Sequence, residues 1–118
     1  MNKLEDFRQL NVWQKAHQLV LEIYRITKDF PQEERFGLVS QMRRAAVSVP
    51  ANIAEGFKKR GKKDKVNFYN IAQGSLEELR YYLILSKDLG FISDAVEFWN
   101  LSDEIGKMLN GLIVSIMR

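Results

Sequence analysis

The chain of 118 residues contains no cysteine, only one histidine and two prolines, and no long apolar run. The lack of cysteine excludes disulfides and thiolate metal sites, and it suits a reducing compartment. With His17 as the only histidine, no pair of histidines can form a zinc or di-iron centre. No stretch approaches the roughly 18 apolar residues that cross a bilayer, and residues 1–10 are charged and lack the apolar segment of a signal peptide. We therefore expect a soluble, cytoplasmic protein that binds no metal or cofactor.

The composition is that of an ordinary folded domain. Hydrophobic residues make up 46% of the chain and charged residues 28%, which excludes a disordered, low-complexity chain. A chain of this length is large enough for a single core. We expect one domain that spans residues 1–118.

Apolar residues recur at spacings of three and four almost from end to end, which is typical of amphipathic helices. The pattern predicts four helices of about 17 to 27 residues, joined by short turns. Such helices form an all-α, antiparallel up-down-up-down four-helix bundle. The inward face of the last helix is expected to comprise Val96, Trp99, Ile105, Met108, Leu109, Leu112 and Ile116.

Capping and breaking residues predict the helix ends. Pro50 falls within the second apolar pattern, which resumes in register beyond it, so we expect a kink and not a break. The expected caps and stops are Asn11 with Gln14 at the first helix start, Pro31 at its end, Gly61 after the second helix, Asp64 before the third, Gly90 after it, and Ser93 before the fourth.

The third and fourth helices carry more apolar residues than one core face can hold. Because no helix is central in a four-helix bundle, the surplus face favours contact with another copy of the chain. The alternative is that large side chains simply lie on the surface, as most proteins allow. The surplus residues are Tyr69, Ile71, Tyr81, Ile84 and Leu85 in the third helix, and Phe98, Leu101, Ile113, Val114 and Met117 in the fourth.

The residues of this chain offer little for catalysis. The sequence has no glycine-rich phosphate loop, nucleophile elbow or paired metal-binding motif. Glu77 and Glu78 are adjacent on a helix and therefore point in different directions, so they cannot act as a paired acid and base. We expect a protein that is not an enzyme.

Positive charge is concentrated in one segment. Six of the eight residues from 58 to 65 are basic and one is acidic, although the whole chain has a net charge of only +3. Such a patch predicts contact with nucleic-acid phosphates without reading of bases. A solvated turn that only keeps the bundle soluble is the other interpretation, and composition leaves both open. The candidate nucleic-acid-binding residues are Lys58, Lys59, Arg60, Lys62, Lys63 and Lys65, with Arg43 and Arg44 as additional members.

Polar residues also stand among the small apolar residues of the second and third helices. Small residues let two helices approach closely, and polar groups can then hydrogen-bond across the seam and set its register. A buried arginine needs a carboxylate partner, so we expect Arg43 or Arg44 to pair with Glu77 or Glu78, in the same or a neighbouring chain. The predicted seam residues are Asn52, Glu55, Gln73, Ser75, Glu77 and Glu78.

Three long strings carry a resemblance that covers nearly the whole chain: "FRQLNVWQKA" from residue 7, "QMRRAAVSVPANIAEG" from residue 41 and "IAQGSLEELRYYL" from residue 71. In these strings the chain resembles the small four-helix-bundle proteins encoded in intervening sequences of bacterial 23S ribosomal RNA genes. It is also similar to the related accessory proteins of diversity-generating retroelements. The resemblance implies a ring-shaped homopentamer. In the retroelement branch it further implies contact of the basic ring with nucleic acid and a reverse transcriptase.

The function expected from the sequence is a non-enzymatic homo-oligomer, pentameric by resemblance, that binds RNA or DNA non-specifically through its basic patch. The alternative is a scaffold that binds another protein, in which the lysine cluster is only a solvated turn. Both hypotheses exclude a membrane partner and require no cofactor.

Overall fold

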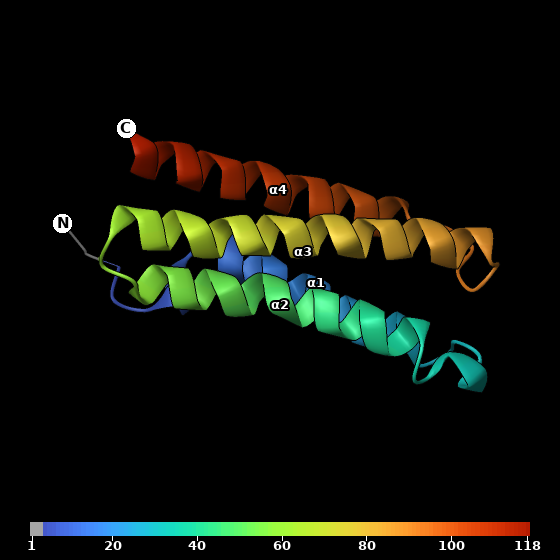
Figure 1. Ribbon diagram of the computed structural model, residues 1–118. Coiled ribbons are helices and arrows are strands. Elements are labelled where there is room, and N and C mark those ends of the chain that lie inside the picture. The colour runs from blue at the N-terminus through green and yellow to red at the C-terminus, as the bar shows by residue number, and fades with distance from the viewer. Residues whose placement is uncertain (1–3) are drawn as a thin grey trace.

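The computed structural model describes residues 4–118, which form a bundle of four long helices. Successive helices run in opposite directions (Figure 1), which confirms the predicted all-α, antiparallel up-down-up-down fold. Within the described residues, no helix is both long and apolar enough to cross a membrane. The elements in chain order are η1 (Phe7–Gln9), α1 (Asn11–Thr27), η2 (Gln32–Glu34), α2 (Leu38–Lys58), α3 (Lys62–Asp88) and α4 (Val96–Met117).

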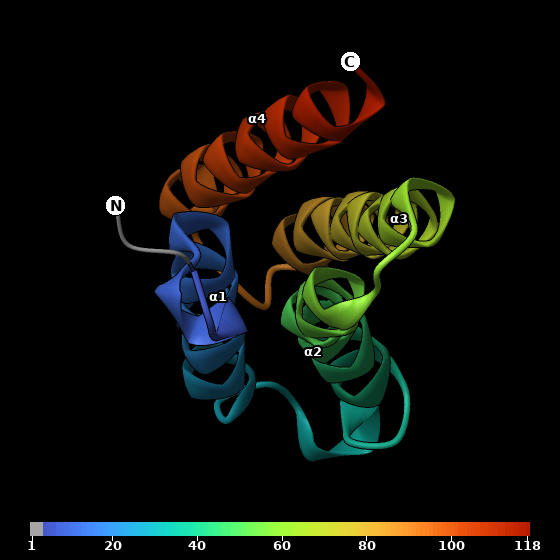
Figure 2. The ribbon, with the colours of Figure 1, turned by 90° about the vertical axis from the view of Figure 1, so that its left-hand side faces the viewer.

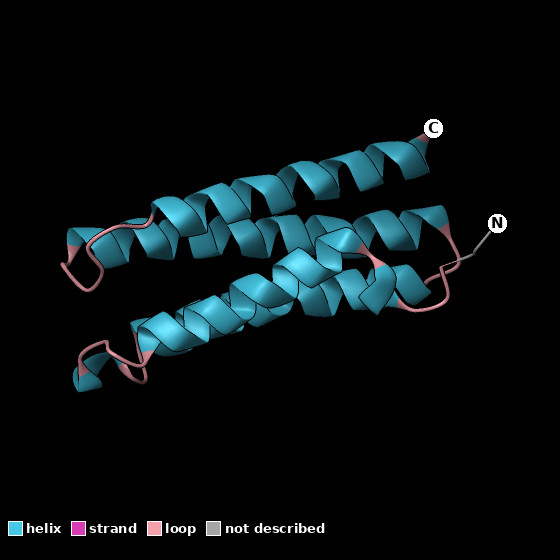
Figure 3. Cartoon of the chain, turned by 180° about the vertical axis from the view of Figure 1, so that it is seen from behind, coloured by secondary structure: helices cyan, strands magenta, loops and turns pink. Residues whose placement is uncertain are grey.

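The four helices surround one core, and each helix packs against two others (Figure 2). The contact between α2 and α3 is the most extensive, whereas α4 makes smaller contacts with α1 and α3. The bundle measures 48 × 24 × 22 Å, and its connections lie at the two ends (Figure 3). The basic segment is therefore displayed at one end of the bundle.

The buried core agrees with most of the predicted apolar pattern, but several residues are buried or exposed contrary to the prediction. Tyr69 is only 2% exposed and belongs to the core, so its assignment to the surplus face was wrong. In α4 the fully inward residues include Ile105, Leu109 and Ile113, whereas Val96 and Trp99 are exposed. The helix is thus rotated relative to the predicted face, because the packing of α1 and α3 decides which side of a broadly apolar helix is covered.

α2 continues without interruption through Pro50, as predicted. Its side chain is buried, and the helix keeps its register on both sides. Near the end of the helix, Gly56 allows the backbone of α2 to come very close to α3. A Cβ atom at Gly56 would lie 2.6 Å from Cε1 of Tyr69, a distance at which something must shift.

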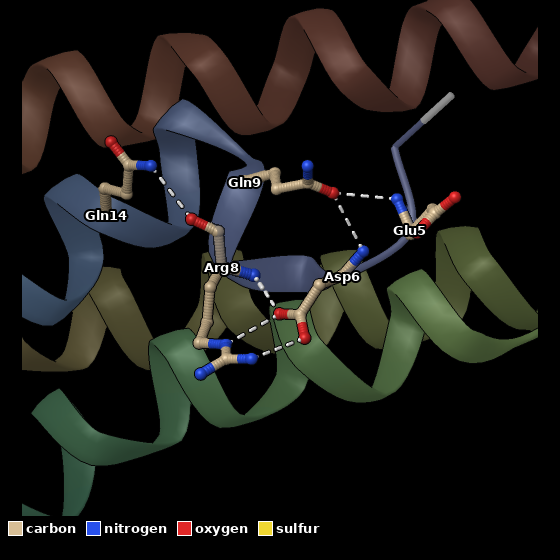
Figure 4. A network of polar contacts seen from close by, with 5 residues as sticks. All are labelled: Glu5, Asp6, Arg8, Gln9 and Gln14. Atoms are coloured by element: carbon tan, nitrogen blue, oxygen red, sulfur yellow. Dashed lines mark hydrogen bonds and ion pairs between the residues drawn. The ribbon is translucent and has the colours of Figure 1, made fainter. Parts of the chain in front are cut away.

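The start of α1 differs from the prediction. Leu10, not Asn11, is the N-cap, and the predicted capping box of Asn11 with Gln14 is wrong. The capping box lies one element earlier, where Asp6 accepts from the backbone of Arg8 and Gln9 Oε1 accepts from the N–H of Asp6 at 3.0 Å (Figure 4). The short helix η1 precedes α1, and Asn11, the expected cap, is instead the first residue of α1.

Three other predicted ends are also displaced. α1 ends at Thr27, four residues before Pro31, and turn hydrogen bonds fill the interval. Gly61 does not follow α2 directly but is the N-cap of α3, so Asp64 lies inside the first turn of α3 and does not cap it. Ser93 does not cap α4, which begins at Val96.

The predicted glycine at the end of α3 is confirmed. Gly90 has φ of 81°, the left-handed conformation that glycine adopts without strain. Its N–H donates to the carbonyl of Lys87, and the N–H of Phe91 donates to the carbonyl of Ser86, both at 2.9 Å. This pair of bonds is a Schellman motif, which ends the helix and turns the chain towards α4.

Candidate nucleic-acid interface

Five basic residues form an exposed cluster at the connection between α2 and α3. Because α2 ends at Lys58 and α3 begins at Lys62, the cluster spans both helix ends and the short link between them (Figure 1). All five side chains are exposed, and none makes an ion pair with another part of the described chain. We call this cluster the lysine turn; its members are Lys58, Lys59, Arg60, Lys62 and Lys63.

The surroundings of the lysine turn add neutral polar groups. Lys62 and Lys63 line a groove of about 450 Å³ where the beginning of α3 meets the end of α4. Asn67 and Asn70, one and two turns along α3, line the same groove, and their amides can both donate and accept hydrogen bonds. Sequence reasoning missed these two residues, although their spacing from Lys63 places them on one helix face.

The N-terminus of α3 contributes to the electrostatics of the same end. Gly61, its N-cap, has no side chain to occupy the first amide N–H groups, which carry the positive end of the helix dipole. Asp64, in the first turn, is the acidic residue of the segment and offsets part of this charge. The net field at the turn is positive, because five cations surround one carboxylate.

Lys65 has a structural contact that the other lysines lack. Its Nζ donates to the carbonyls of Phe57 at 2.7 Å and Gly56 at 3.2 Å, which are terminal acceptors of α2. Partial burial lowers the pKa of Lys65. This side chain therefore holds the end of α2 against α3 and is engaged away from solvent.

The two phenylalanines that flank the basic segment are covered by lysine side chains. Nζ of Lys59 lies 5.1 Å from the ring centre of Phe68, and Nζ of Lys65 lies 5.7 Å from that of Phe57. Both rings are half-buried. Each ring lies beneath a lysine ammonium, and the two rings support the turn from below.

Arg43 and Arg44 do not join the lysine turn. Arg44 and Lys58 are 14 positions apart in one continuous helix, which corresponds to about 21 Å along α2. The two arginines instead line a separate groove of about 580 Å³ on the other half of α2. We call it the arginine groove; its lining residues are Tyr24, Arg35, Phe36, Val39, Ser40, Arg43, Arg44, Val47 and Ser48.

The sequence profile of the 23S rRNA-intervening sequence protein family matches residues 8–111. The chain belongs to this family. A similar solved structure is that of a protein with unknown function from the S23 ribosomal protein family of Bacteroides thetaiotaomicron VPI-5482. It has a TM-score of 0.77 and 27% sequence identity, and the match covers 86% of this chain and 97% of that chain. No curated protein matches the chain.

In this 23S rRNA-intervening sequence protein, a compact polar seam joins α2 and α3. The hydroxyls of Ser48 and Ser75 lie 2.8 Å apart across the two helices. Nδ2 of Asn52 donates to the carbonyl of Ser48 at 2.8 Å and lies 3.0 Å from its hydroxyl. Of the predicted seam residues, the structure therefore brings Asn52 and Ser75 together, with Ser48 between them.

The acidic seam candidates lie elsewhere. Glu55 is exposed, and Gln73 lines a groove between α3 and α4. Glu77 pairs with Arg80 at 3.1 Å, and Glu78 accepts from the Tyr82 hydroxyl at 2.6 Å.

The predicted pairs between these carboxylates and Arg43 or Arg44 are absent within the described chain. Arg43 is satisfied by neutral acceptors of α1 instead: Nε donates to Thr27 Oγ1 at 2.9 Å. Arg80 is a half-buried arginine that sequence reasoning missed, and its guanidinium lies 3.9 Å from the ring centre of Trp99.

The described residues contain no group of three or more histidine, cysteine, aspartate or glutamate side chains placed to hold a metal ion. His17 is exposed, and its ring stacks on that of Trp13 with centroids 5.1 Å apart.

Proposed function

We propose that this chain forms a homo-oligomer that binds nucleic-acid phosphates through the lysine turn, without reading the base sequence. The observation that carries the proposal is the exposed cluster of five cations without ion-pair partners in the described chain, beside the open N-terminus of α3. Lysines bind phosphates as point charges, and amides at a helix N-terminus add donors for the same oxygens.

The oligomer is supported by exposed apolar side chains on α3 and α4. Ile84, Val96 and Trp99 line a groove of about 440 Å³ between these helices, and Val96 is 57% exposed. Further along the same helices, Ile71, Tyr81 and Met117 are also exposed. Covering such a surface with copies of the chain would bring several lysine turns into one assembly, and the family resemblance gives five as the expected number of copies.

Binding to a duplex of RNA or DNA tests the lysine turn. In a titration from low to physiological salt, affinity should fall steeply, with a slope of about 0.9 on logarithmic axes for each phosphate contacted. A variant with glutamine at all five positions of the turn should lose most of the affinity and most of the salt dependence. An unchanged affinity in that variant would reject the proposal.

The matched control removes charges elsewhere on the surface. It carries glutamine at three exposed positions, Arg25, Lys28 and Lys107, and is compared with a variant that carries glutamine at Lys58, Arg60 and Lys62. If the location of the charge matters more than the total charge, the control should keep the affinity for the duplex and the turn variant should lose it.

Light scattering at micromolar concentration tests the oligomer directly. A mass of several chains is expected, and a folded monomer would reject this part of the proposal. Replacing Val96 and Trp99 with serine should shift the mass towards the monomer, whereas serine at exposed Leu21 of α1 should not.

A further inference from the structure

The arginine groove has a composition that the lysine turn lacks. Three arginines and two aromatic rings line it, and no acidic side chain does. It lies beside the first half of α2 and the loop that precedes it, towards the end of the bundle opposite the lysine turn (Figure 1). A concave surface with unneutralised guanidinium groups is a candidate site for an anion.

Arg43 is fixed in place at the wall of the groove. Its Nε donates to Thr27 Oγ1 at 2.9 Å, and Nη2 lies 3.4 Å from the carbonyl of Tyr24. The guanidinium also stands 4.5 Å from the ring centre of Tyr24. Since these contacts come from α1, the charge of Arg43 is held in one orientation before any ligand arrives.

Arg35 and Arg44 are exposed and form no ion pair within the described chain. Glu34 is the acidic residue next to Arg35. Its Oε1 accepts a hydrogen bond at 3.3 Å from the backbone N–H of Leu38, at the start of α2. The two guanidinium groups therefore keep their hydrogen-bond donors available. Guanidinium groups match the geometry of phosphate oxygens and bind them with two parallel hydrogen bonds.

Phe36 distinguishes the groove from a simple anion site. Its side chain is 89% exposed, although it sits among charged residues, and the Arg35 guanidinium lies 5.6 Å from its ring centre. An exposed aromatic ring next to phosphate-binding groups is the arrangement on which bases of single-stranded nucleic acid stack. The carboxylates of an acidic peptide could bind the arginines, but such a peptide has no base to stack on the Phe36 ring.

From these contacts we infer that the arginine groove is a second binding site, separate from the lysine turn, for a nucleotide unit of single-stranded nucleic acid. Arg35 and Arg44 hold the phosphate, Arg43 supplies a fixed positive wall, and the base stacks on Phe36. A duplex, whose bases are already stacked, cannot use the ring. The site is independent of the lysine turn, so each can exist without the other.

The test uses the full-length chain with glutamine at the five positions of the lysine turn, so that only the groove remains. The probe is a fluorescein-labelled oligouridylate of about eight nucleotides, a length within the usual range of single-strand sites. Fluorescence anisotropy at low salt should show binding. No binding of the single strand by this variant would overturn the inference, whatever the turn does with a duplex.

Substitutions in the groove provide the second arm of the experiment. Phe36→Ala should weaken binding of the oligouridylate by about 5- to 150-fold, which corresponds to the loss of one stacked base. Arg35→Gln with Arg44→Gln, which removes both contacts to the one phosphate that they hold, should lower the logarithmic salt slope by about 0.7. Leu21→Ala, which shortens an exposed apolar residue of α1, is the control and should change neither quantity.

Three other outcomes decide against the inference. Equal binding of the oligouridylate by the Phe36→Ala variant would remove the role of stacking. Competition by polyglutamate as effective as that by unlabelled oligouridylate would identify the groove as a site for acidic peptides. A change of oligomer mass in the Phe36→Ala variant would identify it as an interface between copies of the chain.

Discussion

At the C-terminal end of α2 the positive charge is carried by five exposed residues on a turn, whereas near its N-terminal end three arginines surround a groove. The lysine turn rests on a tightly packed base, where Gly56 and Lys65 join α2 to α3. In the arginine groove one charge, that of Arg43, is itself fixed by contacts with α1. The turn is thus suited to a diffuse chain of phosphates, and the groove to a ligand of defined shape.

The close packing beneath the lysine turn gives the largest expected effect. Gly56→Ala would place a methyl group 2.6 Å from the buried ring of Tyr69, so the free energy of unfolding should fall by about 1–3 kcal/mol. Urea unfolding followed by circular dichroism measures it. The control is Gly74→Ala, where no atom lies within 4 Å, and it should raise the stability by about 0.5–1 kcal/mol. Equal stability of the two variants would contradict the close approach of α2 and α3.

Substitutions at Lys65 and Lys62 distinguish a lysine that stabilises the fold from one that is free to bind a ligand. Lys65→Met keeps most of the aliphatic stem but removes the ammonium donor from the carbonyls of Phe57 and Gly56, the second of which also accepts from the N–H of Lys59. The free energy of unfolding should fall by about 1–2 kcal/mol, at the lower end for a hydrogen bond to a charged group because Lys65 is only partly buried. Lys62→Met, at an exposed position, should change it by less than about 0.5 kcal/mol. A larger loss in the Lys62 variant than in the Lys65 variant would reverse the assignment.

Thr27 tests the fixed part of the arginine groove. Thr27→Val preserves the shape of the buried side chain but removes the oxygen that accepts from Arg43 Nε. We expect the free energy of unfolding to fall by about 0.5–1.5 kcal/mol, as measured by thermal or urea unfolding. Thr27→Ser retains the hydroxyl and should restore binding of the oligouridylate if the Val variant reduces it. If the Thr27→Val variant binds the oligouridylate as tightly as the wild type, the groove does not require Arg43 to be held by Thr27.

The N-terminal cap lies outside both basic regions and gives the smallest effect. Hydrogen bonds from the Arg8 side chain, followed by that from its backbone N–H, lower the pKa of Asp6 from 3.8 to about 2. Because this pKa is lower in the folded state, the stabilisation by Asp6 is complete above pH 3.8 and is lost as the pH falls towards 2. The difference in unfolding free energy between the wild type and Asp6→Asn should therefore shrink over that interval. A constant difference from pH 5 to 2 would exclude this linkage, and duplex binding at neutral pH should be equal in both chains.

Much of the fold follows from local patterns in the sequence. Helical periodicity predicts four helices, and a single glycine predicts the end of α3 at Gly90. The caps were harder to predict, since several polar residues near each helix start can serve as the N-cap. Asn11 and Asp64 lie inside the helices that they were expected to cap, and Ser93 lies two residues before Ala95, the N-cap of α4.

The sequence predicts which basic residues are candidates for binding, but it does not predict how they are arranged in space. The sequence identifies the lysine turn, because its five charges lie within six residues on both sides of the helix-breaking Gly61. It does not separate Lys65 from its neighbours, since the carbonyls that bind it belong to the preceding helix. Nor does it reveal the arginine groove, because Tyr24 and Thr27 come from α1 while Arg43 comes from α2.

By itself, the sequence of this protein determined the helices, their antiparallel order and the location of its positive charge, because these depend on residues close together in the chain. The tertiary structure alone decided that Tyr69 and Ile113 are buried, that Trp99 is exposed, and that the arginines and lysines form two sites. Those outcomes depend on the rotation of each helix and on which neighbour covers it. Contacts between distant parts of the chain set both.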